Sequence, residues 1–311
     1  MNQIKFTIGL ILLVMGASIT TVYAQTTGTF VEPEASAIVP QHESRYLILP
    51  RCGFGLQSVL SFSWNANETQ YPFPPGGPPQ TVNLTVSYVT VLNSPYVGKL
   101  ILLYCRATHQ SVTVTLEIGE TPSWCTASLS ETQLQFPITA NVVEQTVRVA
   151  IAVDEHAPAY ALGYVRIHGS VNTLYGPFGL LPFVNGFNGT FTISFVPGYL
   201  PRITIVPASD HLNVTPGNTS ILPINITNHG NARTVVFTEI IEGLPGNWIT
   251  YIPSQVVLEV DMSSEIILSV VPPNDFNGTE SITLSFTPYK ADDYTQHGDP
   301  VYVTIEIICE P

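Results

Sequence analysis

The sequence has few charged residues: Asp, Glu, Lys and Arg make up 11% of its 311 residues, against about 25% in an average soluble protein. Only three lysines occur in the whole chain. The charges are also unbalanced, because 23 acidic residues outnumber 10 basic ones and give a formal net charge of −13. A chain of this charge repels phosphate backbones and offers no basic stripe, so nucleic acid is excluded as a main partner.

The motifs of common enzyme and metal sites are also missing. The histidines show no HExxH or HxH spacing and no CxxC pair occurs, which argues against a zinc site. There is no GxSxG elbow, and Gly53-Phe-Gly55 lacks the third glycine of a dinucleotide-binding loop. The acidic loop 292–299 (DDYTQHGD) is interpreted as solvated rather than as a calcium site. We therefore expect no catalytic residue, no metal and no cofactor.

Long apolar runs are missing beyond the N-terminus. Residues 1–24 have the pattern of a secretory signal peptide, with Lys5, an apolar segment at Ile8–Met15 and a small-residue cleavage site before Gln25. The rival interpretation, an uncleaved membrane anchor, needs about 20 consecutive apolar residues, which this segment does not supply. No later run is long enough either. We expect a secreted protein at the extracellular cell surface whose mature chain has no membrane span.

Cysteine is scarce, but export to an oxidising compartment makes the few cysteines disulfide candidates. These candidates are Cys52, Cys105, Cys125 and Cys309. Four cysteines allow three pairings, and the spacing does not choose among them. Because three of the four precede residue 198, we expect one bridge in the N-terminal part, with Cys309 either reaching across or remaining free.

What the sequence does contain is an internal repeat. In the first copy, residues 112–118 (VTVTLEI) are followed by Pro122-Ser-Trp124; in the second, residues 235–241 (VVFTEII) are followed by Pro245-Gly-Asn-Trp248. Further downstream, the corresponding segments are 147–153 with 266–271 and 164–167 with 282–286. Two divergent copies of one strand pattern indicate two similar domains.

Short alternating runs such as 82–86 and 190–196, separated by Pro, Gly and Asn turns, are typical of antiparallel strands. No window of eleven residues shows a helical stripe, and the apolar run 99–105 is interpreted as another strand. We predict an all-β fold of two tandem immunoglobulin-like antiparallel β-sandwiches after a signal peptide. The predicted segments are a signal peptide at 1–24, an extended tail at 25–43, a first sandwich at 44–198 and a second at 202–309. One tryptophan is expected to fill each core, namely Trp124 and Trp248.

Seven N-glycosylation sequons are candidates for modification in a secreted protein. They lie at Asn67, Asn83, Asn188, Asn213, Asn218, Asn225 and Asn277. Asn83 and Asn225 alternate with apolar neighbours, so their side chains should face solvent. Glycans there would replace the missing surface charge.

The segment 175–187 is the candidate binding loop, because its aromatic residues stand among turn formers. They are Tyr175, Phe178, Phe183 and Phe187. Either this loop folds over its own sandwich or it is a binding surface. A second aromatic loop lies at Tyr71–Phe73, and Asn228–Asn231 (NHGN) is interpreted as a turn rather than a polar site.

Pro122–Ser130 (PSWCTASLS) and Asp154–Tyr160 (DEHAPAY) resemble the signature of archaeal cell-surface proteins built from tandem immunoglobulin-like domains. Pro216-Gly217, Ile224–Asn231 and Pro245–Trp248 resemble the sandwich often found beside carbohydrate-active modules. The resemblance covers roughly residues 80–309. It implies a fold and a surface location, and it implies no catalytic residues. Many members of this family also end in a membrane helix, which this sequence does not show.

These observations favour a non-catalytic cell-surface structural or adhesion protein that assembles with itself or with other surface proteins. The alternative is a carbohydrate-binding module that holds a polysaccharide with the aromatic loops of the first domain. A second alternative, implied by the resemblance of the second domain, is a noncatalytic accessory subunit of a surface hydrolase.

Overall fold

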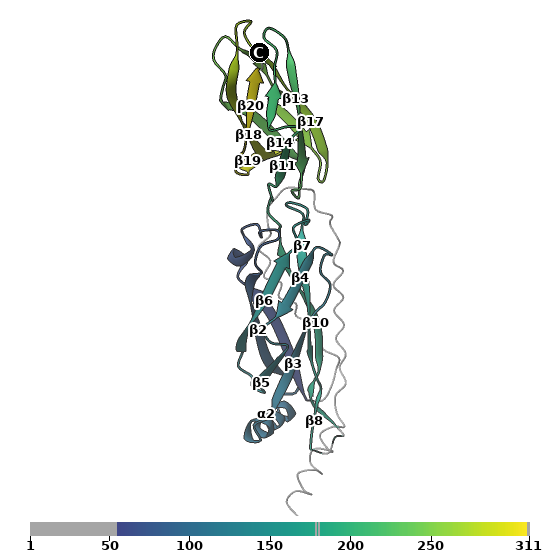
Figure 1. Cartoon of the computed structure of the whole chain (residues 1–311). Coiled ribbons are helices and arrows are strands. Elements are labelled where there is room, and N and C mark those ends of the chain that lie inside the picture. The colour runs from purple at the N-terminus through teal and green to yellow at the C-terminus, as the bar shows by residue number, and fades with distance from the viewer. Residues whose placement is uncertain (1–54, 178, 180, 310–311) are drawn as a thin grey trace, which may run out of the picture. The chain divides into compact units, whose positions relative to one another are not determined.

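The computed structural model describes residues 55–177, 179 and 181–309 (Figure 1). The predicted signal peptide at 1–24, the tail at 25–43 and the first residues of the predicted first sandwich, 44–54, lie outside the described residues. So do Cys52 and Phe178.

The described chain consists mainly of strands, with one short 3-10 helix, η1, and one α-helix, α2. The elements up to residue 195 are β1 Leu56–Trp64, η1 Ala66–Thr69, β2 Gln80–Leu92, α2 Val97–Ala107, β3 Ser111–Ile118, β4 Cys125–Leu129, β5 Gln133–Pro137, β6 Val143–Val153, β7 Gly163–Val171, β8 Leu174–Tyr175, β9 Pro182–Asn185 and β10 Phe187–Phe195. The elements after it are β11 Ile203–Pro207, β12 His211–Asn213, β13 Ser220–Asn228, β14 Thr234–Glu242, β15 Ile249–Tyr251, β16 Gln255–Leu258, β17 Ser263–Val271, β18 Gly278–Lys290, β19 Asp293–His297 and β20 Val301–Cys309.

The N-terminal strands form two sheets, in the orders β4-β6-β2-β1-β9-β8 and β10-β7-β3-β5. Their pairing is antiparallel apart from the short contact of β1 with β9. Alternation along β2 turns Val82, Leu84 and Val86 to one side, where all three are fully buried. Tyr88 and Phe136, from opposite sheets, meet at 5.5 Å between ring centroids. The core therefore lies between the two sheets.

The C-terminal strands form a second pair of sheets, ordered β11-β13-β17-β15 and β12-β20-β18-β14-β16, with β19 added to β18. Ile224, Leu268 and Phe286 are fully buried in a separate hydrophobic cluster. The predicted all-β fold of antiparallel sandwiches is confirmed. The domain limits 44–198 and 202–309 stay a prediction; the two hydrophobic clusters lie within them.

Strand order repeats as the sequence does. The order β4-β6-β2-β1 corresponds to β15-β17-β13-β11, and β10-β7-β3-β5 corresponds to β20-β18-β14-β16. The aligned segments 112–118 and 235–241 lie on β3 and β14, and 147–153 and 266–271 lie on β6 and β17. The sequence repeat is thus a repeat of topology.

The prediction of a strand at 99–105 is wrong, because these residues lie in helix α2. The statement that no window shows a helical stripe is wrong as well. Gly98, Ile101, Leu102 and Cys105 follow the spacing i, i+3, i+4, i+7 and turn toward the first core, where Gly98 lies against Leu92. The second copy makes the same connection, from β13 to β14, with residues 229–233 alone. A helix is therefore not needed to close this sandwich, and α2 is an addition to the first copy. Within the described residues no helix is long and apolar enough to cross a bilayer.

Candidate functional site

Cys105 on α2 and Cys125 at the start of β4 are both buried, and no disulfide joins them. The bridge expected in the N-terminal part is therefore not made by this pair. Cys309 is buried at the end of β20, with its Sγ 3.5 Å from the carbonyl oxygen of Phe276. Pairings with Cys52 involve a residue outside the described part of the chain and stay predictions.

Burial raises the pKa of the Cys105 thiol, and it raises that of Cys125 from 9.0 to about 11. Because the thiolate is the reactive form, we expect iodoacetamide to leave both cysteines unmodified in the native protein at about pH 8 and to alkylate both after unfolding. Folding favours the neutral Cys125 thiol, so the stability it contributes is present below pH 9.0 and is lost as the pH rises toward about 11. Peptide mass spectrometry checks this expectation, and rapid native labelling of Cys125 would contradict it.

The two repeat tryptophans contact the two cores. Trp248 is 9% exposed and makes an edge contact with Phe276 at 4.5 Å between centroids. Trp124 is half-buried and meets Phe195 edge-on at 6.1 Å. Gly163 makes room for it, because a β-carbon there would lie 2.9 Å from the Trp124 ring. Neither indole is a freely exposed platform.

The sequons lie on the surface: all seven asparagines, from Asn67 to Asn277, are exposed. The side chain of Asn83 on β2 does not project freely into solvent as a glycosylation site would, because its Nδ2 donates a hydrogen bond to Oε1 of Glu68 at 2.7 Å. Glycosylation itself stays a prediction at every one of these positions.

The candidate binding loop divides between core and surface. Phe183 and Phe187 pack against the first core, whereas Tyr175 and Leu181 are exposed and Phe178 lies outside the described residues. The loop is a hairpin, in which the N–H of Gly176 donates to the carbonyl oxygen of Leu181 at 3.0 Å. Part of the loop thus folds over its own sandwich, and a binding role for its exposed residues stays a prediction.

The second aromatic loop cannot join the first in one platform. Phe73 is buried, stacks on Phe195 at 4.9 Å and pairs with Pro197, while Tyr71 beside it is exposed. These contacts lie at the Phe195 end of β10, whereas the 175–187 loop leads into its Phe187 end. A strand of this length separates the two loops by roughly 26 Å, at about 3.3 Å per residue.

Sequence reasoning missed an apolar surface that α2 builds beside the hairpin. Tyr96, Leu100, Leu103 and Tyr104 are exposed and follow the spacing i, i+4, i+7, i+8 along one face. The Tyr104 ring meets Phe183 edge-on at 5.7 Å, which joins α2 to the β8–β9 hairpin at one end of the sandwich (Figure 1). We call the exposed side chains of α2 and of this hairpin the α2 tip. They are Tyr96, Leu100, Leu103, Tyr104, Tyr175 and Leu181.

A second apolar surface lies on the outer side of the β11-β13-β17-β15 sheet. Ser269 of β17 lies in register between Ile221 of β13 and Tyr251 of β15. Both flanking side chains are exposed, Tyr251 by 65%. Ile267, two residues before Ser269 on β17, is exposed as well. We call this surface the β13–β17 face; its exposed apolar side chains are Val206, Ile221, Ile249, Tyr251 and Ile267. The signal in the sequence was apolar residues at positions where alternation calls for polar ones.

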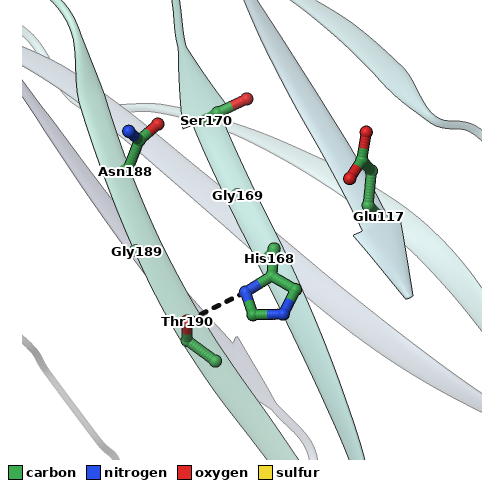
Figure 2. Close-up of a pocket in the computed structure, with 7 residues that line it drawn as sticks. All are labelled: Glu117, His168, Gly169, Ser170, Asn188, Gly189 and Thr190. Atoms are coloured by element: carbon green, nitrogen blue, oxygen red, sulfur yellow. Dashed lines mark hydrogen bonds between the residues drawn. The ribbon is translucent and has the colours of Figure 1, made fainter. Parts of the chain in front are cut away.

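A polar hollow of about 310 Å³ lies on the outer side of the β10-β7-β3 strands (Figure 2). Glu117, His168 and Thr190 stand in register across three strands, and His168 Nδ1 lies 3.0 Å from Thr190 Oγ1. Ser170 and Asn188 form the next row. The hollow thus offers hydrogen-bonding groups, and the His168 nitrogen contacts a threonine hydroxyl rather than Ser170. Sequence reasoning singled out Asn188 alone.

The NHGN turn holds a buried polar side chain. Asn228 is 0% exposed, its Nδ2 donates to the carbonyl oxygens of Ala232 and Leu258 at 2.9 and 3.3 Å, and its Oδ1 accepts the N–H of Gly230 at 2.9 Å. The turn interpretation is therefore incomplete, because the asparagine also ties the turn to the end of β16.

No family model matches this chain, and no curated protein matches it. Among solved structures it is similar to a protein of unknown function from Porphyromonas gingivalis W83, with 11% identity and a TM-score of 0.28 over 81% of this chain and 99% of that one. It is similar to the periplasmic chaperone SfaE, with 11% identity and a TM-score of 0.24 over 81% and 100%. It is also similar to a PapD-like domain of human CEP192, with 10% identity and a TM-score of 0.27 over 34% of this chain and 84% of that one. At these low values we draw no conclusion about this chain from the likenesses.

Proposed function

We propose that this chain is a secreted, non-catalytic structural or adhesion protein of the cell surface, and that it associates with a second copy of itself through the β13–β17 face. The observation that carries the proposal is an apolar surface on the solvent side of a sheet, in a chain whose net charge of −13 otherwise favours separate, soluble molecules.

The composition of this face suits a contact between like surfaces. Its centre holds Ile221, Ile267 and Tyr251, while Asn225 and Glu265, paired across β13 and β17, add a polar row beside Val206. The proposed contact is one that the chain makes without a glycan at Asn225. A contact between identical patches closes as a two-fold dimer, so it needs no second complementary surface. The signal-peptide pattern, the exposed sequons and the low charge support secretion and a surface location.

Association through this face predicts a concentration-dependent dimer. We expect sedimentation velocity of the mature chain to show dimers at high micromolar concentration and the double variant Ile221→Asp, Ile267→Asp to remain monomeric, because like charges would face each other across the contact. Tyr71→Asp, a charge on an exposed ring outside the face, is the matched control and should dimerise normally. A monomeric parent chain, or a double variant that dimerises as well as its parent, would refute the proposal.

Saccharide binding is the second candidate function. The polar hollow favours it, since Glu117, His168 and Ser170 present hydrogen-bonding groups side by side. Retention on a polysaccharide column that is lost in Glu117→Ala would move the assignment to this function.

A further inference from the structure

We infer that the α2 tip docks onto an anionic lipid surface and thereby holds the protein at a membrane as a peripheral protein. This inference goes beyond the proposed self-association, because it uses a different surface, and it supplies a means of retention that needs no membrane-spanning segment.

The first step of the argument is that α2 has two apolar sides and that only one of them is used by the fold. Gly98 and Cys105 are buried, and Ile101 and Leu102 pack against the first core. On the outer side, Leu100 is 61% exposed and Leu103 is 66% exposed. Since the second copy closes its sandwich without a helix, the outer leucines are not a by-product of closing the fold. A helix held rigidly from behind presents them at no further ordering cost.

The second step concerns charge. No acidic residue occurs between Glu68 and Glu117, and residues 174–187 carry no charge at all. Within the same stretch, α2 carries Lys99 and Arg106, both exposed, which are two of only ten basic residues in the chain. In a protein of net charge −13, the α2 tip is therefore free of acidic residues in its own two segments and bears positive charge. This pattern is complementary to an anionic surface.

The third step is the kind of side chain at the border of the apolar patch. Tyr96 and Tyr104 share the exposed face with the leucines, and Tyr175 is exposed on the hairpin that Tyr104 contacts through Phe183. Tyrosine rings are enriched at the level of lipid headgroups because one end is apolar and the other polar. Leucines flanked by tyrosines and by cations suit the boundary between acyl chains and headgroups, where apolar burial and electrostatic attraction add.

The test is co-sedimentation of the full mature chain with vesicles. We expect binding to vesicles of phosphatidylglycerol and phosphatidylcholine in equal parts, and weaker binding to phosphatidylcholine alone or at high salt. Leu100→Ser with Leu103→Ser should weaken binding at least about tenfold, since both exposed side chains lose the apolar contact that they would make with the acyl chains. Lys99→Glu with Arg106→Glu should weaken binding to the anionic vesicles severalfold and affect neutral vesicles little.

Ile221→Ser with Ile267→Ser is the matched control, because it removes two exposed aliphatic side chains from the β13–β17 face. It should leave vesicle binding unchanged even where it abolishes self-association, so the two proposals can fail separately. Circular dichroism confirms that each variant is folded.

Three results would overturn the inference. The first is a parent chain that binds neither kind of vesicle, and the second is a Leu100→Ser, Leu103→Ser variant that binds as tightly as the parent. The third is protection of Leu100 and Leu103 from hydroxyl-radical oxidation in the absence of vesicles. Protection in the monomer would show that another segment of the chain covers them, and protection only in the dimer would show that a second copy covers them. Free oxidation of both side chains would support the inference.

Discussion

Replacing Trp248 with alanine is expected to lower the free energy of unfolding of the second sandwich by about 3–5 kcal/mol, the usual cost of deleting a large buried aromatic side chain. The indole is 9% exposed and packs edge-on against Phe276 in the second hydrophobic cluster. Its removal loses both the burial of the ring and that contact, and the neighbouring strands cannot fill the space without shifting. Urea unfolding followed by circular dichroism, fitted with one transition for each hydrophobic cluster, measures the loss.

Two other replacements calibrate this result. Tyr302→Ala removes an exposed ring from strand β20 of the same sandwich, outside the β13–β17 face, and should cost less than about 0.5 kcal/mol. Trp124→Ala should fall between the two, because that ring is half-buried against the first cluster. A loss below about 1 kcal/mol for Trp248→Ala would show that its ring does little for the core, and a role as a ligand platform would then return.

The repeat was the part of the fold that could be predicted best. Alternating apolar residues have a period of two in any strand, and the proline and tryptophan after residues 118 and 241 mark the same turn in both copies. Burial of one strand face therefore leaves a readable pattern even where identity is low. The order of strands within each sheet depends on contacts between distant residues, and no short pattern carries it.

Helix α2 could not be separated from a strand by its apolar run alone. A short apolar run such as 99–105 suits either structure, because its length alone does not distinguish a buried strand from a buried helix segment. The run has three leucines and only one β-branched residue, Ile101, which favours a helix. The spacing of Gly98, Ile101, Leu102 and Cys105 was a second helical signal.

The candidate surfaces could be predicted even less, because each combines residues that are distant in the sequence. Phe183 was found in the sequence because aromatic residues crowd its loop, but Tyr104, the α2 residue whose ring it meets, comes from a segment about 80 residues earlier in the chain. The β13–β17 face joins three strands, and Ile221 or Ile267 alone is an ordinary exposed residue. A surface of this kind exists only once the strands are in register.

Asn228→Ala is the second change expected to have a large effect. The side chain is fully buried and satisfies main-chain groups on both sides of the turn: the carbonyl oxygens of Ala232 and Leu258, and the N–H of Gly230. Alanine removes this partner from a fully buried position. The carbonyl oxygen of Ala232 keeps the hydroxyl of Thr234, which donates to it at 3.1 Å, whereas the other two groups lose a buried partner. We expect a loss of about 3 kcal/mol, the upper part of the range for unsatisfied buried groups. Asn225→Ala, on the exposed side of the same strand, is the control in unglycosylated protein and should be nearly neutral.

Asn228→Asp separates the role of the amide donor from that of side-chain volume. An aspartate keeps the oxygen that accepts from Gly230 but replaces the Nδ2 donor with a second oxygen, which would face the carbonyl oxygens of Ala232 and Leu258. Burial and these oxygens raise the pKa of such a carboxyl group. The stability of the variant should therefore be greatest at low pH, where the protonated group can donate, and should fall as the pH rises through the raised pKa. At neutral pH we expect Asn228→Asp to unfold at lower urea concentration than Asn228→Ala, and on acidification the order should reverse. If the aspartate variant were as stable as its parent at neutral pH, the amide donor would not be what holds the turn to β16.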